Sequence, residues 1–75
     1  MNTKMANVVD RAILMYGGQA EFARRLTPYV GKEVSRQRVH NWLKRGGFSR
    51  EVIQAVHQLT RLPYAELLES ALDDG

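Results

Sequence analysis

Residues 36–44 combine hydrogen-bond donors and positive charge on polar side chains at helical spacing. The set consists of Arg36, Gln37, Arg38, His40, Asn41 and Lys44. These residues are interspersed with Val39, Trp42 and Leu43, so that one stripe of a helix faces the domain and the other faces outward. An outward face of this kind suits a partner that is both anionic and polar, and duplex DNA has these properties. We therefore predict binding to double-stranded DNA.

Two helices must position this polar face, and residues 19–47 have the pattern of a helix-turn-helix. Ala23 is small where the two helices must cross closely. Ser35 is a suitable N-cap for the second helix of the pair, because its hydroxyl can accept from an N–H of the first turn. Apolar residues at helical spacing hold the two helices together: Phe22, Leu26, Val34, Val39, Trp42 and Leu43.

The whole chain reads as five helices, and no segment favours a strand. Hydrophobic periodicity places the helices at about residues 7–16, 19–26, 36–45, 50–60 and 63–72. The glycine pairs at 17–18 and 46–47 are expected to end the first and third helices. Ser49 is expected to cap the fourth helix, and Pro63 fits the first turn of the last. We predict one all-α domain over residues 1–75, with residues 1–4 and 73–75 frayed.

The charge of the chain is unevenly distributed along the sequence. The 75 residues carry a net charge of +3. Residues 24–50 carry +7, with eight basic residues against Glu33 alone, whereas residues 51–75 carry −4. Positive charge therefore coincides with the proposed reading element, as expected of a DNA-binding surface; the alternative is a solvated basic face without a partner.

Other classes of function find little support. The chain has no cysteine, and His57 has no Cys, Asp or Glu at metal-ligand spacing, so we expect no metal. The glycine pairs do not follow strands, and no nucleophile with its base is apparent, so we expect no cofactor, no small-molecule substrate and no catalysis. There is no long apolar run for a secretory signal or a membrane span. We expect a soluble protein in a reducing cytoplasm.

The chain resembles the small lambda-repressor-like proteins of phages and prophages, in particular the Cro-type and YdaS-like regulators. The resemblance covers about residues 8–70. It rests on a first helix ending in Tyr-Gly-Gly, on Gln19 opening the second helix, and on three motifs: Phe22-Ala23-x-x-Leu26, Val34-Ser35-x-x-x-Val39-x-x-Trp42 and Arg45-Gly46. Jointly these motifs are fairly specific, although each alone is common in helical proteins.

The resemblance implies a compact five-helix domain with its third helix in the major groove, and a homodimer that represses transcription from a roughly palindromic operator. It also places the protein in a bacterial cell or a phage-infected host. The base-reading positions of the family fall on Arg36 and Gln37, and one turn later on His40 and Asn41; Arg38 suits a base or a phosphate. A solvated helix face is the alternative for these residues. The expected phosphate contacts are Gln19, Lys32, Lys44, Arg45 and Arg50.

The sequence departs from the family between the two motif helices. A tight turn is usual there, whereas residues 27–33 precede Val34 and Ser35 here and predict an elongated turn, some six residues longer. Pro28 and Gly31 are expected to break the helical pattern. Longer surface loops cost little entropy, so the motif can accommodate the insertion. The insertion affects the angle at which the third helix would meet DNA.

The last helix has more apolar side chains than a short helix needs to bury within its own domain. A palindromic site also demands two-fold symmetry. We therefore expect a dimer interface formed by Leu67, Leu68, Ala71 and Leu72. Two alternatives to a repressor are an antitoxin that binds DNA and also holds a toxin protein, and a protein-interaction module whose basic face is merely solvated.

Overall fold

The structure is a computed structural model that describes residues 7–71, and its secondary structure over this range is helical. The elements are α1 (Val8–Tyr16), α2 (Gln19–Val30), α3 (Arg36–Arg45), the 3-10 turn η1 (Arg50–Val52), α4 (Ile53–Thr60) and α5 (Tyr64–Glu69). The predicted all-α fold with five helices is confirmed for the described part of the chain. The expected frayed residues 1–4 and 73–75 lie outside it.

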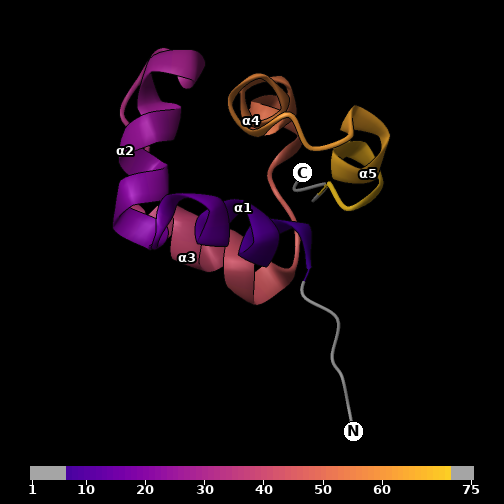
Figure 1. The fold of residues 1–75 in the computed structure, drawn as a ribbon, viewed down its shortest axis with the longest axis horizontal. Helices are drawn as coiled ribbons and strands as arrows, with labels where there is room; N and C mark the ends of the chain where they lie inside the picture. Colours follow the sequence, from indigo (N-terminus) through magenta and orange to yellow (C-terminus); the bar gives the residue numbers. More distant parts are fainter. Residues whose placement is uncertain (1–6, 72–75) are drawn as a thin grey trace, which may run out of the picture.

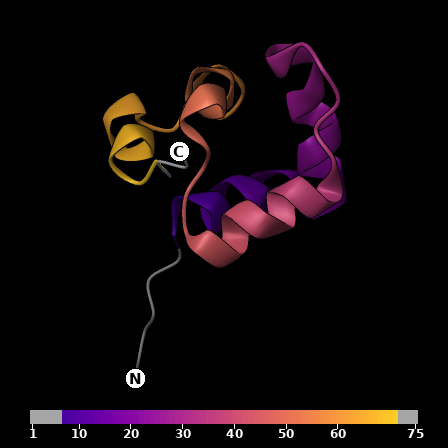
Figure 2. The same ribbon diagram turned by 180° about the vertical axis from the view of Figure 1, so that it is seen from behind.

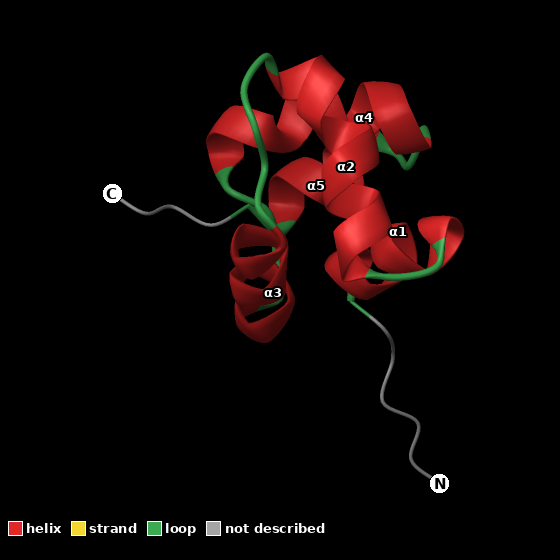
Figure 3. Cartoon of the chain, turned by 90° about the vertical axis from the view of Figure 1, so that its left-hand side faces the viewer, coloured by secondary structure: helices red, strands yellow, loops and turns green. Residues whose placement is uncertain are grey.

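Helix α2 is the element around which the others are arranged. It contacts α1 at one end, α3 across the connection between them, and α4 along its side, while α5 packs against α4 (Figure 1). Seen from behind, α3 lies along the outside of the molecule with α1 beyond it (Figure 2). A third view shows α3 projecting from the group formed by the other helices (Figure 3). Most side chains of α3 are exposed to solvent.

The core forms where one face of each helix meets the others. Phe22 of α2, Val39 of α3 and Leu67 of α5 are fully buried. Phe48 joins them from the connection after α3; its ring centroid lies 5.3 Å from that of Trp42 and 6.0 Å from that of Phe22. Apolar side chains from four segments therefore hold α3 against the domain from its inner side.

Helices α1 and α3 begin and end at local capping signals. The side chain of Asn7 accepts from the N–H of Asp10 at 2.8 Å, and Ser35 accepts from the N–H of Arg38 at 3.1 Å. Each helix then ends at a glycine in the left-handed conformation, Gly17 and Gly46. The predicted N-cap role of Ser35 is confirmed, and so are the predicted bounds of the third helix.

Helix α2 continues beyond the predicted end at Leu26 and reaches Val30, with Pro28 inside it. The prediction of an elongated turn over residues 27–33 is therefore wrong. The fixed φ of proline is compatible with a helix, and its missing N–H costs one bond in the last turn rather than in the middle. Val30 packs partly against the core, and Gly31 ends the helix in the left-handed conformation, so the connection to α3 is residues 31–35.

The hydroxyl of Thr27 fixes this connection. It donates to the carbonyl oxygen of Ala23 at 2.9 Å and accepts from the N–H of Val34 at 3.0 Å. Val34 is itself buried, with 3% of its surface exposed. One side chain of α2 therefore satisfies a buried backbone group immediately before α3, which sets the path between the two helices.

Two predictions near the ends of α4 and α5 need correction. Ser49 precedes η1 but makes no capping bond, because its hydroxyl accepts from the indole N–H of Trp42 instead. Helix α5 ends at Glu69, earlier than predicted, and the Ser70 hydroxyl donates to the carbonyls of Glu66 and Leu67. Gly47 lies so close to this end that an added Cβ would stand 1.9 Å from the carbonyl oxygen of Ser70.

Candidate nucleic-acid interface

The exposed face of α3 carries half of the side chains expected to contact DNA. The exposed positions occur at consecutive turns of the helix, whereas Val39 and Trp42 point into the core. Leu43, predicted to be buried, is partly exposed. Five polar side chains form the outward stripe: Arg36, Gln37, His40, Asn41 and Lys44. The structure therefore brings these predicted residues together on one accessible surface.

Four basic side chains at or near this stripe have no charge partner in the described part of the chain. Lys32 lies in the connection before α3, Arg36 in its first turn, and Lys44 and Arg45 in its last. None of the four forms an ion pair or a side-chain hydrogen bond with another residue of the described range 7–71. Their charges are therefore available to an anionic partner.

Arg38 differs from the other predicted base-reading residues. Its guanidinium forms an ion pair with Glu51 at 2.6 Å and lies over the ring of Trp42, 5.3 Å from the centroid. Only about a third of its side chain is exposed. These contacts direct Arg38 toward η1 and away from the outward stripe, so the structure does not group it with Arg36 and Gln37. The sequence around Arg38 does not indicate this ion pair, because Glu51 lies thirteen residues further along the chain.

On α2, part of the positive charge is neutralised by an acidic residue in the first turn of the same helix. Glu21 pairs with Arg24 at 2.7 Å and with Arg25 at 2.9 Å. These hydrogen bonds, first to Arg24 and then to Arg25, lower the pKa of Glu21 below its ordinary value of 4.5. The same contact raises the pKa of Arg24. One positive charge therefore remains in excess on α2, whereas the four basic residues at or near α3 have no acidic partner among residues 7–71.

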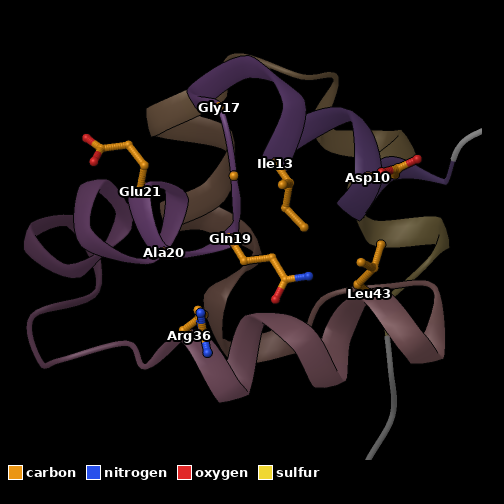
Figure 4. A pocket seen from close by; sticks show the side chains of 9 residues that line it. Asp10, Ile13, Gly17, Gln19, Ala20, Glu21, Arg36 and Leu43 are labelled. Atoms are coloured by element: carbon orange, nitrogen blue, oxygen red, sulfur yellow. The ribbon is translucent and has the colours of Figure 1, made fainter.

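Gln19 lies where α1, α2 and α3 converge. It is half-buried and lines an open hollow of about 730 Å³ with Ile13, Arg36 and Leu43 among its other walls. Figure 4 shows the side-chain amide of Gln19 directed toward α3, between the turn before α2 and the helix below it. Gly18 supplies no side chain to cap α2. An amide and an uncapped helix terminus are suited to an oxyanion.

The remaining predicted residues lie at separate places. Arg50 is exposed at the start of η1, beyond the end of α3. Leu67 was predicted to lie in the dimer interface, and this prediction is wrong. Its side chain is fully buried in the core of its own chain. Ala71 is partly buried against the core, Leu68 is 40% exposed, and Leu72 lies outside the described residues. The open apolar surface of α5 consists of Leu68 and Tyr64.

Comparisons with protein families, curated proteins and solved structures found no match to this chain. Within residues 7–71, no helix is long and apolar enough to cross a membrane. The same residues contain no group of three or more His, Cys, Asp or Glu side chains that would hold a metal ion. The candidate interface is a polar, basic helix face on a small helical scaffold.

Proposed function

We propose that this chain is a sequence-specific DNA-binding protein in which α2 and α3 form a helix-turn-helix and α3 enters the major groove. The observation that carries the proposal is the outward stripe of α3, where hydrogen-bond donors alternate with unpaired positive charge. A ten-residue helix is about 15 Å long and about 10–12 Å wide with its side chains. The major groove is about 12 Å wide, which suits such a helix.

The residues divide into two roles. Arg36, Gln37, His40 and Asn41 contact base edges, because they occupy the outward stripe and have the donors and acceptors that base edges recognise. The flanking residues contact phosphates, which fixes the register of the helix but carries no sequence information. These residues are Gln19, Lys32, Lys44, Arg45 and Arg50.

We propose further that the protein acts as a transcriptional repressor of Cro type in the cytoplasm of a bacterial cell or a phage-infected host. It binds a roughly palindromic operator as a homodimer, because a symmetric site matches a two-fold protein. The exposed side chains of Tyr64 and Leu68 on α5 support an association surface away from α3. Two exposed apolar side chains on each chain form only a small interface, so the dimer is expected to be weak in solution.

Selection of duplexes bound by the purified protein from a random pool tests this proposal. The expected result is one enriched motif with two-fold symmetry, whose half-sites are separated by about one helical turn of DNA. Sedimentation of the protein with the selected duplex is expected to give two chains for each site. A pool that remains random after selection, or affinity that does not change with salt, would contradict the proposal.

A further inference from the structure

Two side chains of the outward stripe form a hydrogen bond with each other. The amide nitrogen Nε2 of Gln37 donates to Oδ1 of Asn41 at 3.2 Å, one helical turn later. Both residues are exposed, and neither has another side-chain hydrogen bond among residues 7–71. Pairs of this type at positions i and i+4 are mutually stabilising on a helix surface. The two amides are therefore coupled before any partner arrives.

The bond leaves Gln37 with a defined set of free groups. A side-chain amide has two N–H donors on its nitrogen and two lone pairs on its oxygen. Because one N–H is directed to Asn41, the other N–H and Oε1 remain for a partner. A half-turn of the Gln37 amide alone would exchange its oxygen and nitrogen and set Oε1 against Oδ1 of Asn41, so the bond would form again only if the Asn41 amide turned as well. The bond to Asn41 therefore favours the orientation in which Oε1 of Gln37 is free for a partner.

Adenine and guanine differ in the hydrogen-bonding groups that they present to the Gln37 amide in the major groove. Adenine offers the N7 acceptor and the N6 donor, whereas guanine offers two acceptors, N7 and O6. An amide with one free N–H and a fixed oxygen matches adenine in two bonds. A freely rotating amide can also turn its nitrogen toward O6 of guanine. Fixing the amide therefore favours adenine over guanine.

We propose that Gln37 and Asn41 act as one unit, in which Gln37 reads an adenine and Asn41 is a positioning residue that excludes guanine by holding the Gln37 amide. This inference rests on the proposed function, because it assigns a base to the same helix face. It revises the role given to Asn41 under the proposed function, because Asn41 here acts through Gln37 and makes no base contact of its own. A direct consequence is that both residues control the same base pair.

The experiment begins by replacing each base pair of the selected duplex in turn and measuring affinity for the wild-type protein and Gln37→Ala. The base pair of interest is the one at which the wild type prefers adenine and Gln37→Ala does not. A bidentate contact predicts a wild-type preference of about 5- to 150-fold there. The ratio of affinities for adenine and guanine at this pair is the readout.

Asn41 is then changed in two ways at the same base pair. Asn41→Ala removes the acceptor but leaves Gln37 able to bind adenine, so the adenine-to-guanine ratio is expected to fall below that of the wild type, toward that of Gln37→Ala. Asn41→Asp keeps an oxygen that can accept from Gln37, so the ratio is expected to persist while the added negative charge weakens binding to all duplexes alike. The double variant Gln37→Ala/Asn41→Ala is expected to match Gln37→Ala, since the two residues are one unit.

Matched controls separate this effect from general damage. Gln58→Ala removes an exposed glutamine from α4, outside the proposed interface, and is expected to leave every ratio unchanged. The thermal transition of each variant checks that the fold is retained. We expect an unchanged transition, because Gln37 and Asn41 are exposed.

Three outcomes would overturn the inference. One is an Asn41→Ala variant that keeps the wild-type ratio, and another is one that changes preference at a different base pair. The third is a bound motif in which no adenine depends on Gln37. In all three the protein still selects a sequence, so the proposed function stands. A wild-type protein that selects no sequence removes the proposed function and, with it, this inference.

Discussion

The indole Nε1 of Trp42 donates a hydrogen bond to the hydroxyl of Ser49 at 3.0 Å, which joins the middle of α3 to the residue before η1. Trp42 is 3% exposed and its ring packs edge-on against Phe48. The polar end of the tryptophan is therefore satisfied within the domain. This contact orients the buried side of α3, and with it the outward stripe on the opposite side.

Ser49→Ala is expected to lower the free energy of unfolding by about 1–3 kcal/mol, because it leaves the buried N–H of Trp42 without a partner. Ser49→Thr keeps the hydroxyl and is the matched control. Urea denaturation measures the change, and the chemical shift of the indole proton reports the bond itself. Equal stability of Ser49→Ala and the wild type would show that this bond contributes nothing.

Gly47→Ala is expected to destabilise the fold by about 1–3 kcal/mol, because the new methyl group must displace the backbone of Ser70. Gly31→Ala is the comparison, since its Cβ would meet open space although its φ is 93°. Amide resonances near Ser70 should shift in Gly47→Ala and remain in place in Gly31→Ala. Unchanged resonances near Ser70 in both variants would contradict the close approach.

Lys44→Ala is expected to weaken binding to selected and random duplexes by the same factor. A phosphate contact contributes to both, and the slope of log affinity against log salt should become shallower by about 0.9. Fluorescence anisotropy titrations at several salt concentrations measure this slope. A loss confined to the selected duplex would instead make Lys44 a base-reading residue.

Glu51→Gln is expected to raise affinity for duplex DNA. The change removes a negative charge from the edge of the interface and releases Arg38, which Glu51 binds at 2.6 Å. The salt slope should steepen by up to about 0.9 if Arg38 then reaches a phosphate. Glu69→Gln, at an exposed position of α5, is the control for net charge alone. Equal gains in both variants would show that the release of Arg38 has no effect.

The pH dependence of stability should differ between the wild type and Glu21→Gln. The folded pKa of Glu21 lies below its ordinary value of 4.5, so its contribution is present above that pH. As the pH falls through the folded pKa, the carboxylate is protonated and the advantage of the wild type disappears. Denaturation between pH 3 and 7 and an NMR titration of the Glu21 side chain measure the two effects. A side-chain midpoint at or above 4.5 would refute this.

The sequence predicted best those features that depend on neighbouring residues. The bounds of α3 follow from Ser35, from the apolar positions Val39 and Trp42, and from Gly46, all within a dozen residues. The exposed stripe follows from the same periodicity. For this reason most of the candidate base-reading residues were found together on one face.

Features that depend on residues brought together by folding were missed. Pro28 indicates a break on its own, whereas the packing of Val30 and the bond from Val34 to Thr27 favour another turn of helix. Ser49 has the local pattern of a cap, yet it binds Trp42 across the connection. The packing of α5 against α4 places Leu67 in the core, which its spacing alone does not distinguish from a surface position.

The two bonds of the Thr27 hydroxyl, to the carbonyl oxygen of Ala23 and from the N–H of Val34, attach the connection to α2 immediately before α3. If α3 enters the major groove as proposed, these bonds restrict its inclination to α2 before binding, and less entropy is lost in ordering this connection. A preset inclination leaves little room for the protein to adjust to an imperfect half-site. Bending and twisting of the duplex would then accommodate the mismatch, so stiff and flexible base steps would be distinguished even where no side chain touches them.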